Sequence, residues 1–137
     1  MAPRGARFNP GASEAALREA EEQLGWQFPE DLRALLAESD GIEDEPRWTV
    51  LAWPVERIVR ENMRHQDRDW PFAKDGPWSD RLCFADDGCG NDFFFDLSMP
   101  DRCVCVWNYI DSQAYEVAST FRAFWTGWLS GTLDARW

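Results

Sequence analysis

Apolar and polar positions along the chain fall into short runs, and the clearest pair of runs lies near the middle. Residues 82–85 and 93–95 are apolar and partly aromatic, as strands require. The residues between them, 86–92, are mostly Asp, Asn and Gly, which are the usual turn formers. The pattern predicts a β-hairpin, and so dense an aromatic run implies that helices cover at least one of its faces.

Helical spacing occurs in three places before the hairpin. Ser13 suits an N-cap and precedes apolar residues at helical spacing, with Gly25 as the expected C-terminal stop. Pro29 opens a second helix, which residues 39–41 end. From Val55 onward, a third and shorter helix carries its apolar side chains on one stripe.

Two more strands and a last helix follow from the same pattern. Residues 48–53 form the first plausible strand, and residues 102–108 should pair with residues 93–97. Ser119 or Thr120 caps a C-terminal helix with a wide apolar stripe. The order of elements, without repeated βαβ units, predicts an α+β fold. We expect a single domain with a mainly antiparallel sheet and a central acidic-turn hairpin, packed against two N-terminal helices and one C-terminal helix.

The segments outside these elements define the expected domain boundaries. Residues 1–12 contain two prolines and two glycines, so we expect a flexible N-terminal segment. Structure should begin at Ser13, in a single domain over residues 13–137. Residues 43–46 are expected to form an exposed acidic loop. Residues 65–80 are expected to form a long irregular excursion, and connections of that kind are often functional.

The hairpin turn also resembles a known family. Residues 84–91, Phe-Ala-Asp-Asp-Gly-Cys-Gly-Asn, followed by an apolar strand that ends in Asp96, resemble the signature of the SUKH superfamily. The similarity extends from residues 24–32 to residues 117–121, whereas the Trp-rich residues 70–78 depart from it. That superfamily contains fungal regulators of cell-wall assembly and bacterial immunity proteins that neutralise toxins delivered between cells. The resemblance implies a SUKH-like protein-binding domain and carries over no catalytic residues.

The net charge of the chain indicates which classes of partner to expect. The 137 residues include 25 acidic and 14 basic side chains, which gives a net charge of −11. This excess of acid argues against nucleic-acid binding, because Lys and Arg supply most of the affinity for the phosphate backbone. It would attract a basic protein and speed its approach, although acidity also serves solubility alone. The oligomeric state does not follow from the sequence.

Cysteine usage and hydropathy indicate the compartment. The four cysteines, Cys83, Cys89, Cys103 and Cys105, lack the pattern of a disulfide framework or of a paired zinc motif. No secretory apolar region precedes them, and no apolar run approaches the roughly 20 residues of a membrane span. We therefore expect a cytoplasmic protein with reduced thiols that does not enter a membrane.

Oxygen-bearing side chains are concentrated in the hairpin turn, at Asp86, Asp87, Asn91, Asp92 and Asp96. Their spacing does not fit a calcium-binding EF-hand loop, and a hydrogen-bonded turn is the simpler interpretation. The sequence leaves open whether the turn ever binds a cation. A small hydrolase could use the same acids, yet the sequence shows nothing that would selectively bury one carboxyl. With one histidine and no phosphate-binding glycine loop, we expect no catalytic residue, metal or cofactor.

These observations favour a non-enzymatic protein-binding domain. From the resemblance, we expect a bacterial immunity protein that neutralises a basic toxin domain by direct binding. Two alternatives stay open: a regulatory scaffold for endogenous cell-wall or signalling proteins, and a small hydrolase that uses the acids of residues 86–96. The candidate partner-binding residues are acids, one asparagine and two tryptophans that could act as anchors. They are Asp40, Glu43, Asp44, Glu45, Asp86, Asp87, Asn91, Asp92, Trp70 and Trp78.

Overall fold

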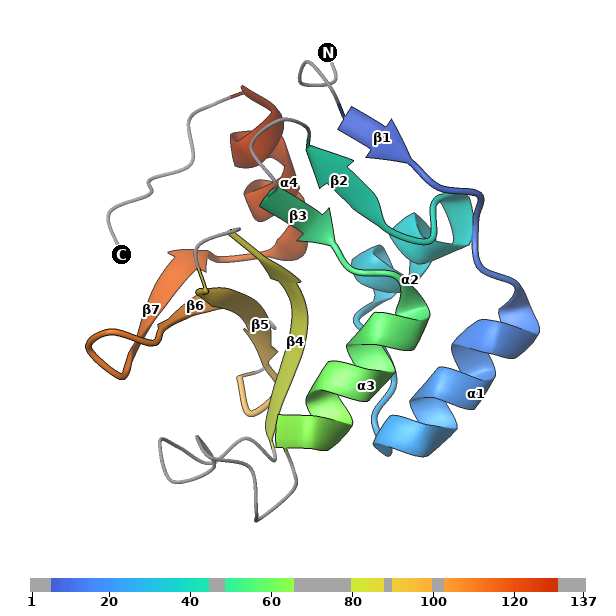
Figure 1. The fold of residues 1–137 in the computed structure, drawn as a ribbon, viewed down its shortest axis with the longest axis horizontal. Coiled ribbons are helices and arrows are strands. Elements are labelled where there is room, and N and C mark those ends of the chain that lie inside the picture. Colours follow the sequence, from blue (N-terminus) through green and yellow to red (C-terminus); the bar gives the residue numbers. More distant parts are fainter. Residues whose placement is uncertain (1–5, 45–48, 66–79, 88–89, 100–102, 131–137) are drawn as a thin grey trace.

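The computed structural model describes residues 6–44, 49–65, 80–87, 90–99 and 103–130, which form four helices and seven strands (Figure 1). In chain order, the elements are β1 (Ala6–Phe8), α1 (Glu14–Leu24), α2 (Glu30–Glu38), β2 (Ile42–Asp44), β3 (Thr49–Ala52), α3 (Val55–His65), β4 (Arg81–Asp86), β5 (Asp92–Asp96), β6 (Val104–Asn108), β7 (Gln113–Ala118) and α4 (Phe121–Ser130).

All seven strands belong to one antiparallel sheet, in which the spatial order of the strands follows the chain from β1 to β7. In the predicted hairpin of β4 and β5, Leu82 lies opposite Phe95. The next pairing, of β5 with β6, places Phe94 opposite Cys105. The α+β class, the antiparallel sheet and the acidic-turn hairpin are therefore confirmed.

Helix α4 covers one face of this hairpin with phenylalanine rings. The ring centroid of Phe84 lies 4.6 Å from that of Phe95 and 5.6 Å from those of Phe121 and Phe124. Phe93 approaches Phe124 at 5.0 Å. Burying one such side chain stabilises a fold by roughly 1.5–3 kcal/mol, and edge-to-face ring pairs add about 0.5–1.5 kcal/mol. The predicted cap is present as well, because the Thr120 hydroxyl accepts a hydrogen bond from the Ala123 amide at 3.0 Å.

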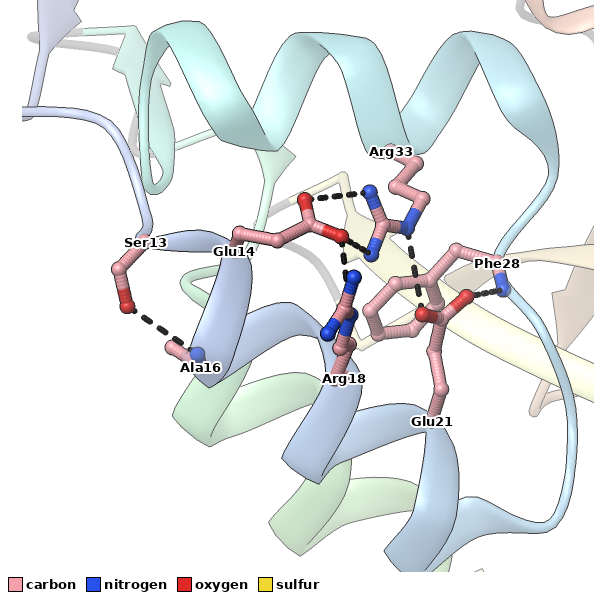
Figure 2. A network of polar contacts seen from close by, with 7 residues as sticks. All are labelled: Ser13, Glu14, Ala16, Arg18, Glu21, Phe28 and Arg33. Atoms are coloured by element: carbon pink, nitrogen blue, oxygen red, sulfur yellow. Dashed lines mark hydrogen bonds and ion pairs between the residues drawn. The ribbon is translucent and has the colours of Figure 1, made fainter.

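The two N-terminal helices are joined by a polar network centred on Arg33 (Figure 2). Its guanidinium donates two hydrogen bonds to the carboxylate of Glu14 at 2.8 and 2.9 Å, and one to Glu21 at 3.2 Å. Glu21 also accepts a bond from the Phe28 amide at 2.8 Å, which fixes the connection between α1 and α2. The bonds from Arg33 hold the pKa of Glu14 below its ordinary value. The expected start of α1 is confirmed, since the Ser13 hydroxyl accepts a bond from the Ala16 amide at 3.1 Å (Figure 2).

Helix α3 is joined to β4 through the buried side chain of Asn62. The pairing register of β4 with β5 shifts between Cys83 and Ala85, so Phe84 lacks a partner on β5. Asn62 accepts a hydrogen bond from the Cys83 amide at 2.8 Å and donates one to the Cys83 carbonyl at 2.8 Å. It also donates to the Ile58 carbonyl at 2.7 Å. One amide side chain thus satisfies both backbone groups of Cys83 where the strand is irregular.

Three strands were not predicted, and two expectations about their residues are wrong. Regular structure does not begin at Ser13, because Ala6–Phe8 form β1 and pair with β2. Glu43 and Asp44 do not lie in a loop, because Ile42–Asp44 form β2 between β1 and β3. Neighbouring backbones on both sides hold these acidic residues extended, so their polar character did not prevent strand formation. The third missed strand is β7.

Two of the predicted segments lie partly outside the residues that the structure describes. The irregular excursion predicted for residues 65–80 begins at His65, the last residue of α3, and ends at Asp80. Its residues 66–79 lie outside the described residues, as do residues 1–5. Among the described helices, none is long and apolar enough to cross a membrane.

Candidate functional site

The turn between β4 and β5 is held by its own side chains. The Asp87 carboxylate accepts hydrogen bonds from the backbone amide of Asn91 at 3.2 Å and from its side-chain amide at 2.8 Å. The Asp87 amide donates to the Asn91 carbonyl at 3.1 Å. Asn91 is buried, whereas Asp87 is half-buried. These two predicted partner-binding residues therefore shape the turn, and their role in binding a partner stays a prediction.

Asp86 is hydrogen-bonded to two residues near the start of α3. It accepts a hydrogen bond from the indole Nε1 of Trp53 at 2.7 Å and one from Arg57 at 3.2 Å. The Arg57 guanidinium lies over the Trp53 ring, 4.6 Å from its centroid. Trp53 is buried, so this cluster links the end of β3, α3 and β4 inside the molecule. Reversing the charge of Asp86 would disrupt these internal bonds as well as any contact with a partner.

Asp92 lies directly opposite Asp86 in the β4–β5 ladder. Burial, followed by the negative charges of Asp86 and Glu61, raises the pKa of Asp92 to about 7, although Arg57 opposes this effect. A half-buried carboxyl beside other carboxylates is therefore present, which the sequence did not reveal. It is half-protonated near neutral pH and can hold or release a proton there.

The acidic turn lies against the tip of the next hairpin. Asn91 accepts a hydrogen bond from the Tyr109 amide at 3.3 Å. A Cβ atom placed on Gly90 would lie 2.7 Å from the Tyr109 ring, so the glycine backbone is in close contact with that ring. Gly90 also has a φ of +98°, which glycine adopts without strain. The two hairpin ends are thus fixed relative to each other.

Large apolar side chains are exposed at this tip. Ile110 is 79% exposed, Tyr109 53% and Tyr115 39%. Asp111 accepts hydrogen bonds from the Gln113 amide and the Tyr115 hydroxyl, which orders the loop. The tip projects on the side of the sheet away from α1 and α3 (Figure 1). We call Asp87, Tyr109, Ile110, Asp111 and Tyr115 the acidic-aromatic surface.

Sequence reasoning missed the apolar members of this surface. A signal was available, because Tyr109 and Ile110 lie between Asn108 and Asp111, two turn-forming residues. A bulky apolar pair inside a turn has no neighbouring element to bury it. Such a pair is expected to be exposed, and exposed apolar clusters with a polar rim are typical of interaction sites.

A glycine substitution tests the contact between the two hairpin ends. Gly90→Ala should lower the free energy of unfolding by about 2 kcal/mol, because it adds both backbone strain and a clash with the Tyr109 ring. Gly25→Ala is the matched control, since Gly25 has a φ of +75° but open space around its Cα. It should cost about 1 kcal/mol. Equal losses in urea denaturation would show that the Gly90–Tyr109 contact is unimportant.

The other predicted residues have separate positions. Asp40 caps α3, because its carboxylate accepts a hydrogen bond from the Val55 amide at 2.7 Å. Glu43 in β2 lies opposite Val50 of β3, and Val50 lies opposite Asp86 of β4. Glu43 and Asp86 are therefore at the same level across the sheet, separated by one strand. Asp44 ends β2, opposite Thr49. The remaining three, Glu45, Trp70 and Trp78, lie outside the described residues.

Grouped metal ligands and a large cleft are the other features that could mark a binding site. Within the described ranges, no three His, Cys, Asp or Glu side chains are grouped so that they could hold a metal ion. A cleft of about 690 Å³ lies elsewhere, between the α1–α2 connection and α4, with Phe28, Phe95 and Phe121 in its lining. Its polar lining includes Glu21 and Arg33, which already bond to each other. The exposed apolar side chains of the acidic-aromatic surface make it a candidate for protein contact.

Comparison with known proteins identifies the family. The family model described as SMI1 / KNR4 family (SUKH-1) matches residues 11–127, which is most of the chain. No curated protein matches the chain. The matched residues include α1 through most of α4 and the whole β4–β5 turn. The chain therefore belongs to the SMI1/KNR4 family (SUKH-1).

Proposed function

We propose that this SUKH domain is a non-enzymatic protein-binding domain, and that it acts as a bacterial immunity protein that neutralises a basic toxin by direct binding. The observation that carries the proposal is the acidic-aromatic surface, where ordered acids adjoin exposed apolar side chains. Family membership supports the protein-binding part, because the SUKH superfamily includes immunity proteins. The net charge of −11 supports a basic partner.

The geometry suits tight binding because the surface is ordered before a partner arrives. The Asn91 side chain holds the Tyr109 backbone, the Tyr109 ring lies against Gly90, and Asp111 holds the Tyr115 hydroxyl. Little side-chain freedom would be lost on binding, and tyrosine supplies a large contact area with few rotatable bonds. Ile110 at the centre would pass from solvent into the interface. Apolar and aromatic anchors of this kind dominate the binding energy of many interfaces.

A substitution at the centre of the surface tests this proposal. The probe is the protein encoded immediately upstream of this chain in its source genome. Wild type should form a complex with it and restore growth of cells that express it. Ile110→Lys should weaken the complex at least about tenfold, because it places a charge in an apolar contact facing a basic protein. Met99→Lys, at a residue 45% exposed and outside the surface, adds the same charge and should change affinity less than about threefold.

The outcomes separate the proposal from its first alternative. If the upstream protein neither binds the chain nor harms cells, the immunity role is wrong. The domain is then a regulatory scaffold for endogenous cell-wall or signalling proteins, which could use the same surface. Equal affinities of Ile110→Lys and Met99→Lys would show that the interface lies elsewhere on the domain.

A hydrolase is a second candidate, because one observation favours it. Asp92, with its pKa raised to about 7 by burial, faces Asp86, which is held by Trp53 and Arg57. Two carboxyls in different environments can serve as the general acid and the general base of a hydrolase. Hydrolysis of chromogenic glycosides by wild type, lost in an Asp92→Asn variant that is shown to be folded, would establish this function. We expect no turnover by either protein.

We further propose that the protein acts in the cytoplasm. Cys83, Cys103 and Cys105 are buried and form no disulfide among themselves, and the sulfur atoms of Cys103 and Cys105 lie within hydrogen-bond distance of each other, at 3.8 Å. Burial raises the pKa of Cys105 to about 12, with the neighbouring Cys103 adding to the effect, so its reactive thiolate form is rare. Buried cysteines that keep their thiol form suit a reducing compartment.

A further inference from the structure

The strand that follows the acidic-aromatic surface forms one edge of the sheet. β7 is the last strand in the sheet order and pairs only with β6 among the described strands. Within the described ranges, no strand pairs with the backbone groups on its other side, which is the condition for a strand from outside to add there. Residues 113–116 are exposed one after another, so their own side chains lie open to solvent.

β7 has few of the features that protect an edge strand from pairing. Residues 113–118, QAYEVA, contain no proline and no lysine, and Glu116 is their only charge. The pairing register of β6 with β7 shifts once, between Val104 and Cys105, which lie opposite the C-terminal end of β7. The opposite edge of the sheet, β1, is only three residues long. Residues 113–116 thus form the regular and open part of an edge.

The register defines what each face of this edge offers. Glu116 lies opposite Cys105, whereas Tyr115 lies opposite Val106, so the two side chains are on different faces of the sheet. An added strand would meet an acid on one face and an aromatic ring on the other. Directly opposite residues interact across a ladder, and opposite charges or apolar pairs there are favourable. The complementary strand therefore alternates basic and apolar residues.

We propose that β7 is a docking edge on which an extended segment of the protein partner adds an eighth strand, with Lys or Arg alternating with apolar residues. This proposal rests on the proposed function and names the segment that such a partner would use. Backbone hydrogen bonds would supply affinity, and the alternating side chains would supply specificity. The neighbouring Tyr109 and Ile110 would extend the contact beyond the added strand.

Charge favours a basic partner over a second copy of this chain. Each copy carries a net charge of −11, and residues 108–118 contain Asp111 and Glu116 but no basic residue. Two such edges would bring like charges together, which disfavours self-pairing. A basic segment would instead neutralise them. We therefore expect the free protein to be a monomer with respect to this edge.

Amide exchange tests the docking edge. With the upstream-encoded protein as probe, hydrogen exchange would be followed by NMR at single residues in the free chain and in the complex. Apart from that of Gln113, which already donates to Asp111, the outward amides of residues 113–116 should exchange quickly in the free chain. They should exchange at least about tenfold more slowly in the complex, because they gain backbone partners. Amides at the other edge, in β1, should be unaffected.

A charge-matched pair of variants adds a second readout. Glu116→Lys should weaken the complex about tenfold, whereas Glu22→Lys, an exposed glutamate on α1, should change it less than about threefold. A complex that leaves exchange of residues 113–116 unchanged overturns the docking edge but not the immunity role. Protection in the free chain that rises with its own concentration would show self-pairing and also overturn it. Absence of any complex overturns both proposals.

Discussion

Replacing Asn62 with alanine is expected to lower the free energy of unfolding by about 3 kcal/mol. The Asn62 side chain makes three hydrogen bonds of 2.7–2.8 Å, two of them to the backbone of Cys83. Alanine would leave the Cys83 amide and carbonyl without these partners and would open a small cavity. A buried backbone group that loses its partner costs about 1–3 kcal/mol. Urea denaturation at neutral pH measures the loss directly.

The next residue on α3 provides the control. Met63 is 46% exposed, so Met63→Ala changes the helix surface and should alter the free energy of unfolding by less than about 0.5 kcal/mol. Asn62→Asp adds a further test, because it keeps an acceptor for the Cys83 amide but removes the two donated bonds. It should also destabilise strongly. A loss below about 1 kcal/mol in Asn62→Ala would show that water replaces the side chain without penalty.

The second large effect is a dependence of stability on pH that originates at Asp92. Because the folded-state pKa of about 7 exceeds the unfolded value of about 3.9, the folded protein binds the proton more tightly. The contribution of Asp92 is therefore most favourable below about pH 4 and is lost as the pH rises to about 7. The difference between the two pKa values corresponds to about 4 kcal/mol. Wild type should be less stable at about pH 8 than at about pH 5 by roughly 2–4 kcal/mol.

Asp92→Asn isolates this contribution, since asparagine resembles the protonated acid in shape and carries no charge. The variant should be more stable than wild type at about pH 8 by roughly 2–4 kcal/mol, and the advantage should shrink toward about pH 4. Glu22→Gln, at an exposed carboxylate on α1, controls for the loss of one negative charge and should show no such gain. If Asp92→Asn is destabilised at every pH, the Asp92 carboxylate makes a favourable interaction and its pKa is not raised.

The elements that sequence analysis predicted share a strong local signal. α1 has a serine cap and a glycine stop, and Gly25 indeed has a left-handed φ of +75°. The β4–β5 hairpin has two apolar runs around turn-forming residues. β1 and β2 could not be predicted, because three residues are too few to show an alternating pattern. β7 was missed for another reason, since its first four residues are exposed and therefore lack an apolar face.

Sequence analysis located the acidic turn but not the contacts that surround it. The acidic turn was found from its Asp, Asn and Gly residues. The hydrogen bond from Trp53 to Asp86 joins residues far apart in the chain, so no local sequence pattern indicates that Asp86 makes contacts within the fold. The raised pKa of Asp92 depends on burial and on Glu61 of α3, which only the packing of α3 against β4 brings near. Tyr109 joins the site for the same reason, because Gly90 and Asn91 contact it from another hairpin.

The salt dependence of association tests the central claim, that this domain binds a basic protein partner, most directly. The association and dissociation rates of the upstream-encoded protein would be measured from about 0.05 to about 0.5 M salt. We predict that the association rate falls at least about tenfold while the dissociation rate changes less than about threefold, because long-range attraction acts on encounter. An association rate that is independent of salt, or a bound partner that is itself acidic, would contradict the account.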